Sequence, residues 1–224
     1  MWIAGIAVIV FVCFLLYIGK TSYKDRPAFF RLFVNSYAKI DKKAGHQDYY
    51  AVFTGSSVMK FWASLEEDFL PLKVINRAIP GIKINELGFY IDQLVNKYKP
   101  HKVFIYAGSN DIQGSKARST NDVLDGFKKI VRNIHEQLET ADIYYISIIL
   151  SPAKTRIRNR NEIEKANMAI QEYCGTESYL HYVDLTKKFM KDTGEPDDTL
   201  FRSDKIHITQ ASYEIWRQEI SKYL

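Results

Sequence analysis

The stretch KVFIYAGSND, residues 102–111, is the clearest sign of the fold of this chain. Its residues 103–107 form an apolar run without the polar alternation of a strand that has one face in water. Such a run is typical of a strand buried on both faces of a parallel sheet. The run ends in glycine, serine, asparagine and aspartate, which favour loops. The stretch therefore predicts a buried strand followed by a polar loop.

The same pattern recurs along the chain. Short apolar runs also occupy residues 48–54, 72–76, 143–150 and 180–185. Amphipathic helical patterns, with apolar residues every three or four positions, lie between or after these runs at residues 84–98, 123–138, 163–173 and 213–223. Repeated alternation of strand and helix predicts a five-stranded parallel sheet covered by helices on both sides. We expect this domain to span residues 48–224.

Composition and charge fit one folded domain. The chain has 224 residues, of which 46% are hydrophobic, and this is enough for one core. The net charge of +5 comes from basic residues dispersed among acids, so no nucleic-acid tract is expected. The two cysteines, Cys13 and Cys174, form no CxxC or His-rich motif, which argues against a disulfide framework and a cysteine zinc site.

An uncharged apolar run of 17 residues, Trp2–Ile18, lies near the amino terminus. This length is at the short end for a helix that crosses a bilayer, and the run lacks the polar side of a soluble helix. A cleaved signal peptide is the alternative, but basic residues before the run and a small-residue cleavage site after it are missing. The pattern favours an uncleaved transmembrane anchor over residues 1–19 and a juxtamembrane connector over residues 20–47.

The side of the membrane on which the domain lies is predicted less directly. Only the amino terminus precedes the run. The basic residues follow it: Lys20, Lys24, Arg26, Arg31, Lys39, Lys42 and Lys43. The positive-inside rule then favours a cytoplasmic domain. If the run is instead a signal peptide, the domain is secreted or extracytoplasmic.

Ligands bind open α/β sheets at the carboxyl ends of the strands, so the loops there are the expected site of chemistry. Gly55-Ser56-Ser57 follows the first predicted strand, Gly81 the second and Asn110 the third. Asp204 and His207 lie just before the last helix. Each residue alone is common in helix caps, turns or surface loops. Together, at one edge of one sheet, they predict a reactive site.

These loops resemble the four signature blocks of the SGNH (GDSL-like) hydrolases, over residues 48–224. Gly55-Ser56-Ser57 resembles the first block, in a GSS-type form, and Ser57 matches the nucleophile. Gly81 matches the second block, Gly108-Ser109-Asn110-Asp111 the third, and Asp204 with His207 the fourth. Two positions depart from the family pattern: Ser56 replaces the usual acid, and Pro80 precedes the glycine.

The chemistry of these residues agrees with the resemblance. A serine hydroxyl needs a base to take its proton, and His207 can act as this base if Asp204 orients its ring. The backbone N–H groups of Ser57 and Gly81 and the side-chain amide of Asn110 could stabilise an oxyanion. A helix that begins at Ser57 would add a favourable dipole. Such a site needs neither cofactor nor metal.

We therefore expect a membrane-anchored serine esterase with a three-layer α/β/α flavodoxin-like fold. The resemblance implies small acyl esters as substrates: acetylated carbohydrates, short-chain esters or lysophospholipids. One alternative is an O-acyltransferase, in which a hydroxyl replaces water as the acceptor. Another is a non-catalytic flavodoxin-like module that binds phosphate with Thr54, Ser56 and Ser57 at a helix amino terminus. That module gives Asp204 and His207 no role. The oligomeric state is not predicted.

Overall fold

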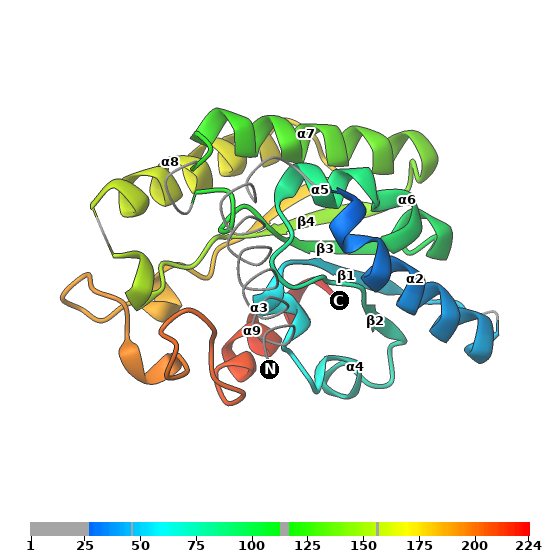
Figure 1. Ribbon diagram of the computed structural model, residues 1–224, viewed down its shortest axis with the longest axis horizontal. Helices are drawn as coiled ribbons and strands as arrows, with labels where there is room; N and C mark the ends of the chain where they lie inside the picture. Colours follow the sequence, from blue (N-terminus) through cyan, green and yellow to red (C-terminus); the bar gives the residue numbers. More distant parts are fainter. Residues whose placement is uncertain (1–26, 46, 113–116, 156) are drawn as a thin grey trace, which may run out of the picture.

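A computed structural model of the chain describes residues 27–45, 47–112, 117–155 and 157–224 (Figure 1). The anchor predicted over residues 1–19 lies outside the described residues, as does the first part of the predicted connector. Within the described ranges, none of the helices combines the length and the apolar character needed to span a membrane.

Five parallel strands form the centre of the molecule. They are β1 (Ala51–Gly55), β2 (Val74–Asn76), β3 (Lys102–Tyr106), β4 (Asp142–Ile146) and β5 (Leu180–Val183). Their order in the sheet is β2-β1-β3-β4-β5, which is the flavodoxin-like order. The register places Phe53, Phe104 and Tyr144 side by side, and neighbouring rings stack with centroids 4.6 Å apart. The predicted parallel sheet is therefore confirmed.

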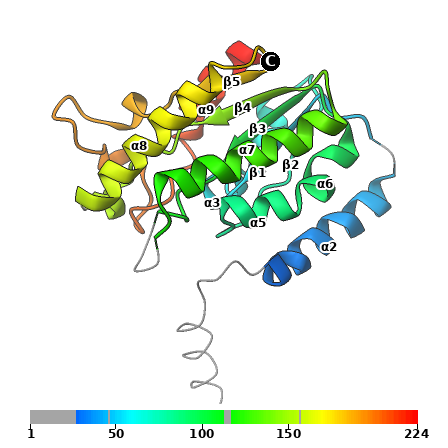
Figure 2. The same cartoon turned by 90° about the horizontal axis from the view of Figure 1, so that it is seen from above.

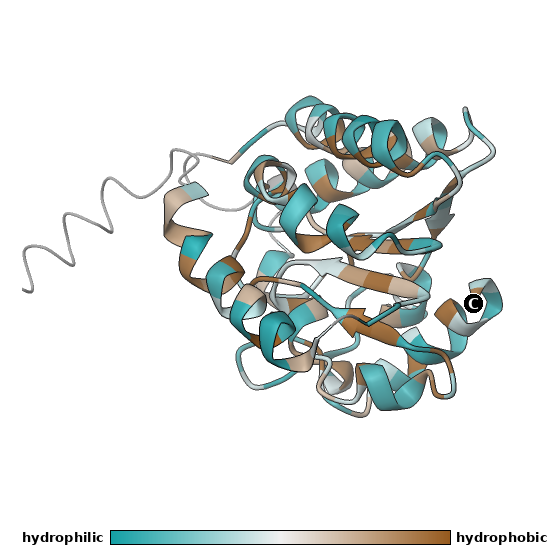
Figure 3. Ribbon diagram, turned by 90° about the vertical axis from the view of Figure 1, so that its right-hand side faces the viewer, coloured by the Kyte–Doolittle hydropathy of each residue, from teal (hydrophilic) through white to brown (hydrophobic). Residues whose placement is uncertain are grey.

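Helices cover both faces of the sheet, as predicted. One face carries α2 (Pro27–Ala44), α5 (Ile84–Phe89), α6 (Ile91–Leu94), α7 (Thr120–Gln137) and α8 (Ile157–Cys174). The other face carries α3 (Ser57–Lys60), α4 (Leu65–Asp68) and α9 (Tyr213–Ile220). Short 3₁₀ turns are η1 (Asn96–Tyr98), η2 (Pro152–Lys154), η3 (Lys187–Phe189), η4 (Asp198–Leu200) and η5 (Ser221–Tyr223). Figure 3 shows the hydrophobic strands between helices whose outer sides are hydrophilic.

One predicted helix is interrupted. The pattern over residues 84–98 becomes α5, α6 and the turn η1, because Tyr90 leaves the helical region with φ −109° and ψ 11°. Gly88 precedes this break and packs against Ile130 of α7, since an added Cβ would lie 3.3 Å from Ile130 Cγ1. A glycine weakens a helix, so the local sequence favours the interruption. By contrast, the pattern over residues 123–138 forms one unbroken helix, α7, and the Ser119 hydroxyl caps its start by accepting from the Asp122 N–H.

The helix α2 falls within the predicted connector but packs against the domain. Phe30, Val34 and Tyr37 are buried in the core, and the Tyr37 hydroxyl donates to the Ala78 carbonyl at 2.5 Å. Tyr37 therefore lies level with the loop that follows β2.

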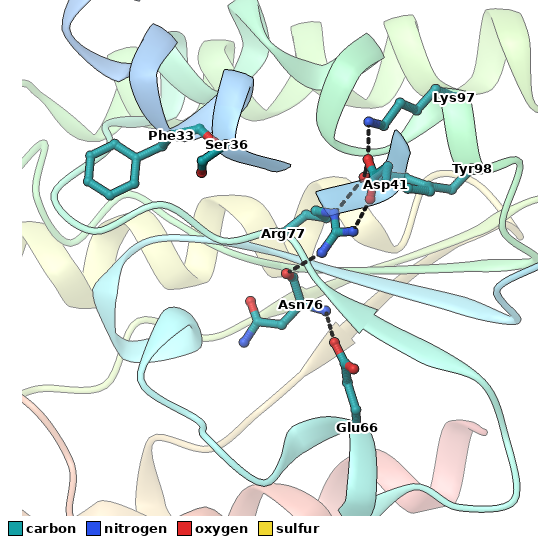
Figure 4. A network of polar contacts seen from close by, with 8 residues as sticks. All are labelled: Phe33, Ser36, Asp41, Glu66, Asn76, Arg77, Lys97 and Tyr98. Atoms are coloured by element: carbon teal, nitrogen blue, oxygen red, sulfur yellow. Dashed lines mark hydrogen bonds and ion pairs between the residues drawn. The ribbon is translucent and has the colours of Figure 1, made fainter. Parts of the chain in front are cut away.

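A half-buried ion pair fixes the other end of α2 (Figure 4). Arg77, directly after β2, pairs with Asp41, which also accepts from Lys97 and from the Tyr98 hydroxyl. Burial tends to raise the pKa of Asp41, but the hydrogen bonds from Lys97 and Tyr98 and the charge of Arg77 outweigh it and lower that pKa. The ionised carboxylate thus joins α2 to the sheet edge and to η1.

Candidate active site

The serine loop follows directly from the packing of β1 against β3. Gly55 has φ +132°, and a Cβ there would lie 2.0 Å from the Tyr106 carbonyl oxygen. Only glycine allows this close approach. The Ser56 N–H then donates to the same carbonyl at 2.8 Å, and α3 begins at Ser57. The turn is therefore held rigidly at the carboxyl end of β1.

The two serines of this loop lie in different surroundings. Ser56 is 1% exposed, makes no side-chain cap bond, and its Oγ has no hydrogen-bond partner among the described residues. Ser57 is the first residue of α3, so its N–H has no acceptor within the helix. Because α3 has only four residues, the dipole expected at Ser57 is weaker than that of a long helix.

The structure brings Ser57, His207 and Asp204 together. His207 Nε2 lies 2.8 Å from Ser57 Oγ, and His207 Nδ1 lies 2.8 Å from Asp204 Oδ2. The other carboxylate oxygen of Asp204 accepts the backbone N–H groups of Ile206 and His207, both at 2.9 Å. A carboxylate only accepts, so Nδ1 carries the proton and Nε2 can accept from the serine hydroxyl.

Asp204 is ionised in this arrangement. Burial tends to raise its pKa, but the backbone N–H and ring of His207 and the N–H of Ile206 outweigh it and lower the pKa of Asp204 to about 2. The carboxylate is therefore charged across the neutral range, where it can stabilise an imidazolium.

The loop that carries His207 is closed by Arg202. The Arg202 N–H donates to the His207 carbonyl at 2.7 Å, and its Nε donates to the Ile208 carbonyl at 3.0 Å. Lys205 adopts φ +59°, a conformation uncommon outside glycine and asparagine, which turns the chain between Asp204 and His207. No sequence motif marks Arg202, so this contact was not predicted.

Phe61 is a second residue that the sequence analysis missed. Its ring lies edge-on to the His207 ring, with centroids 4.9 Å apart, and the Arg202 guanidinium lies 5.3 Å from the Phe61 centroid. Phe61 follows Ser57 by four residues, about one helical turn, and this spacing could have suggested that both face the same way. The contact limits the positions that the His207 ring can take.

Gly81 lies in a tight turn with Pro80. The Ile82 N–H points to the Ile79 carbonyl at 3.4 Å, and Gly81 has φ +77° with nothing within 4 Å of an added Cβ. Proline at the first central position and glycine at the second suit a type II turn. Pro80, which departs from the family pattern, thus favours the turn that presents Gly81.

Asn110 and Asp111 bind the backbone of the segment that follows Gly81. Asn110 Nδ2 donates to the Ile82 carbonyl at 3.1 Å, and Asp111 Oδ2 accepts the Ile84 N–H at 3.1 Å. One N–H of the Asn110 amide is used in this contact, which leaves the second for a ligand. Burial raises the pKa of Asp111 to about 7, although the Ile84 N–H and the charge of Arg118 act in the opposite direction.

Lys154 connects the asparagine loop to the histidine loop. Its Nζ donates to the Ser109 carbonyl at 2.9 Å, while the neighbouring Ala153 N–H donates to the Lys205 carbonyl at 3.0 Å. Burial lowers the pKa of Lys154 to about 8, against the charge of Asp111. The sequence analysis did not identify this lysine, because its role depends on how three loops meet.

A hollow at the opposite end of the sheet lacks such an arrangement. It is lined by residues at the amino ends of the strands, among them Tyr50, Lys73 and His101, and contains none of the predicted site residues. Over the described ranges, no three His, Cys, Asp or Glu side chains come close enough to hold a metal ion.

Comparison with known families assigns the class of this protein. The sequence model of the GDSL-like Lipase/Acylhydrolase family matches residues 45–215, about three quarters of the chain. The protein is an ester-hydrolysing enzyme. It belongs to the GDSL-like lipase/acylhydrolase family, the SGNH family that its four loops resemble. A search of curated proteins found no significant match.

Solved structures share the fold. A Streptococcus pneumoniae protein described as a platelet activating factor aligns with TM-score 0.76 and 19% identity over 98% of each chain. A GDSL-like lipase from Bacteroides thetaiotaomicron aligns with TM-score 0.71 and 18% identity over 85% of this chain and 97% of its own. An acetylxylan esterase from Geobacillus stearothermophilus aligns with TM-score 0.64 and 14% identity over 80% and 95%.

Proposed function

We propose that Ser57, His207 and Asp204 form a catalytic triad that hydrolyses small acyl esters through an acyl-enzyme. The observation that carries the proposal is the hydrogen-bonded series from Ser57 Oγ through both ring nitrogens of His207 to Asp204. Acids, bases and nucleophiles that act together need this mutual geometry. A phosphate-binding module would not require it.

In the first half of the reaction, Ser57 Oγ attacks the ester carbonyl carbon while His207 Nε2 takes the hydroxyl proton. The resulting tetrahedral intermediate collapses, the alcohol leaves with that proton, and the acyl group stays on Ser57. In the second half, His207 activates water, which releases the carboxylic acid and restores the serine. Asp204 stays ionised and stabilises the imidazolium in both halves.

The oxyanion of each intermediate would be held by the backbone N–H groups of Ser57 and Gly81 and by Asn110 Nδ2. The proposal is supported by the contact from Asn110 to Ile82, which places the amide beside the Gly81 turn. It is also supported by the bond from the Ile79 N–H to the Gly55 carbonyl at 2.8 Å, which ties the Gly81 turn to the serine loop. Removing one such donor typically lowers the rate by about 10²–10³.

The substrate class that we propose is a small acyl ester, such as an acetylated carbohydrate, a short-chain ester or a lysophospholipid. Support comes from the family name and from the acetylxylan esterase that shares the fold. The acceptor that we propose is water, in keeping with the acylhydrolase family. An O-acyltransferase would use the same acyl-enzyme, and product analysis with candidate hydroxyl acceptors separates the two.

Hydrolysis of p-nitrophenyl acetate tests the proposal with a matched pair of variants. Ser57→Ala should lower kcat by at least about 10⁴, because the nucleophile is lost. Ser56→Ala changes the adjacent serine, whose Oγ is buried and unpartnered among the described residues, and should keep most of the activity. Equal activity in both variants would refute Ser57 as the nucleophile.

A further inference from the structure

Three large apolar side chains are exposed where α2 begins and α5 ends. Phe29 and Leu32 of α2 are 66% and 79% exposed, and Phe89 of α5 is 65% exposed. The Tyr90 hydroxyl donates to the Pro27 carbonyl at 2.6 Å, which joins the two helices at this point. Figure 2 shows the first turn of α2 beside α5. We call Phe29, Leu32 and Phe89 the apolar patch.

The apolar patch lies on the outer side of α2 and α5, two of the helices that cover one face of the sheet. Tyr37 is level with Ala78, just past the carboxyl end of β2, and Asp41 contacts Arg77 and Tyr98 further toward the amino ends of the strands. The helix α2 therefore runs antiparallel to β2. Phe29 precedes Tyr37 by eight residues and lies about 12 Å from it along the helix axis.

The helix α2 also contacts α3. Lys60, the last residue of α3, places its Nζ 5.0 Å from the centre of the Tyr37 ring. The helix that begins with Ser57 thus touches α2 directly. On α5, Phe89 lies about 7–8 Å along the helix from Ile84, whose N–H is bound by Asp111. Both helices of the patch are therefore packed against the loops of the site.

The sequence before α2 indicates what covers the patch. The uncharged run Trp2–Ile18 ends eight residues before Pro27, and eight residues span at most about 28 Å. Residues 19–26 contain Lys20, Lys24 and Arg26 with a single acid, Asp25. Basic residues next to an apolar run suit the anionic surface of a bilayer. If the run is held in a bilayer, Pro27 cannot lie far from the interface.

We propose that the apolar patch docks on the surface of the bilayer in which residues 2–18 are anchored. Phe29, Leu32 and Phe89 enter the boundary between headgroups and acyl chains, where aromatic and aliphatic side chains of interfacial helices bind. Arg31, which is exposed on the same turns of α2, lies among the lipid headgroups. The patch thus forms a second contact between the domain and the membrane. The proposal does not depend on the reaction that Ser57 performs.

Quenching of tryptophan fluorescence by brominated lipid tests the docking. The full chain carries the background substitution Trp2→Phe, because Trp2 lies in the apolar run. Trp62 and Trp216 can stay, since they are 1% and 0% exposed and out of reach of lipid. The probes are Leu32→Trp and Phe89→Trp, and the matched control is Met168→Trp on α8, where Met168 is 69% exposed. Each variant is reconstituted in phosphatidylcholine and phosphatidylglycerol vesicles, with or without bromine on the acyl chains near the headgroup.

The docked arrangement predicts that Leu32→Trp and Phe89→Trp lose fluorescence in brominated vesicles, whereas Met168→Trp does not. Both leaflets carry bromine, so the result does not depend on which side the domain occupies. Equal quenching of all three probes, or failure of the chain to associate with vesicles, would overturn the proposal. If the tryptophan emission of Leu32→Trp is blue-shifted but not quenched, protein covers the patch, either a second copy of the chain or residues 2–18. That result would also overturn the proposal.

Discussion

Replacing Asp204 by asparagine tests how the carboxylate controls His207. In the wild type, Oδ1 accepts two backbone N–H groups, from Ile206 and His207, and Oδ2 accepts the ring Nδ1–H. An asparagine must keep its oxygen toward the two backbone donors, because the flipped amide would place NH₂ against them. Its NH₂ then faces Nδ1. The ring proton is forced onto Nε2, which can no longer accept the proton of Ser57.

The expected loss follows from this change of tautomer. A wrong tautomer in an otherwise intact triad lowers kcat by about 10⁴, which corresponds to about 5.5 kcal/mol of transition-state stabilisation. Because the pKa of Asp204 is about 2, the wild-type carboxylate is ionised throughout the neutral range. The deficit of Asp204→Asn should therefore be similar at mildly acid and mildly alkaline pH.

The assay is kcat and KM for p-nitrophenyl acetate across this pH range, with circular dichroism to verify folding. Asp198→Asn is the control, because Asp198 is exposed and pairs only at the surface with Lys205 at 3.4 Å. Such a pair contributes about 0–1 kcal/mol, so this variant should stay active. A folded Asp204→Asn enzyme that loses less than about 10², the lower range of general base catalysis, would refute the reasoning.

Three further changes have expected outcomes. Asn110→Ala should lower kcat for p-nitrophenyl acetate by about 10²–10³ with little change in KM, and unchanged kcat would exclude an oxyanion role. Gly55→Ala should lower the free energy of unfolding in urea by at least about 2 kcal/mol, since its Cβ meets the Tyr106 carbonyl at 2.0 Å; Gly194→Ala, at φ +79° with open space, is the milder control. Asp111→Asn tests pH dependence. The folded-state pKa of Asp111 is raised to about 7, so wild-type stability falls as pH rises from the unfolded value toward 7. Between pH 5 and pH 8 the free energy of unfolding, measured in urea, should fall by about 2–3 kcal/mol more for the wild type than for the variant. Equal pH dependence of this free energy in the two proteins would contradict the prediction.

The sheet and the loops of the site were predictable because their signals are local. An apolar run that ends in a polar loop marks a strand buried on both faces, and parallel strands bring their ends to one edge. Ser57, Gly81, Asn110, Asp204 and His207 could therefore be grouped from the amino-acid sequence alone. The order of the strands explains why loops far apart in the chain meet.

Other features depend on contacts that no local pattern encodes. The helix α2 joins the core through Asp41 and Arg77, which are 36 residues apart, so its sequence alone suggested only a connector. Arg202 matters because of the path of the histidine loop, and Lys154 because its side chain reaches the Ser109 carbonyl in another loop. The break after Gly88, by contrast, has a local signal in the glycine itself, which the apolar periodicity of residues 84–98 does not register.

The central claim is that Ser57 is the nucleophile, and a fluorophosphonate probe tests it most directly. The probe reacts with a serine only when a base activates it, and mass spectrometry of the digested protein identifies the modified residue. Our account predicts one modification, on Ser57, that is absent in Ser57→Ala, retained in Ser56→Ala and weakened in His207→Ala. An unlabelled wild type, or a label on another residue, would contradict the account.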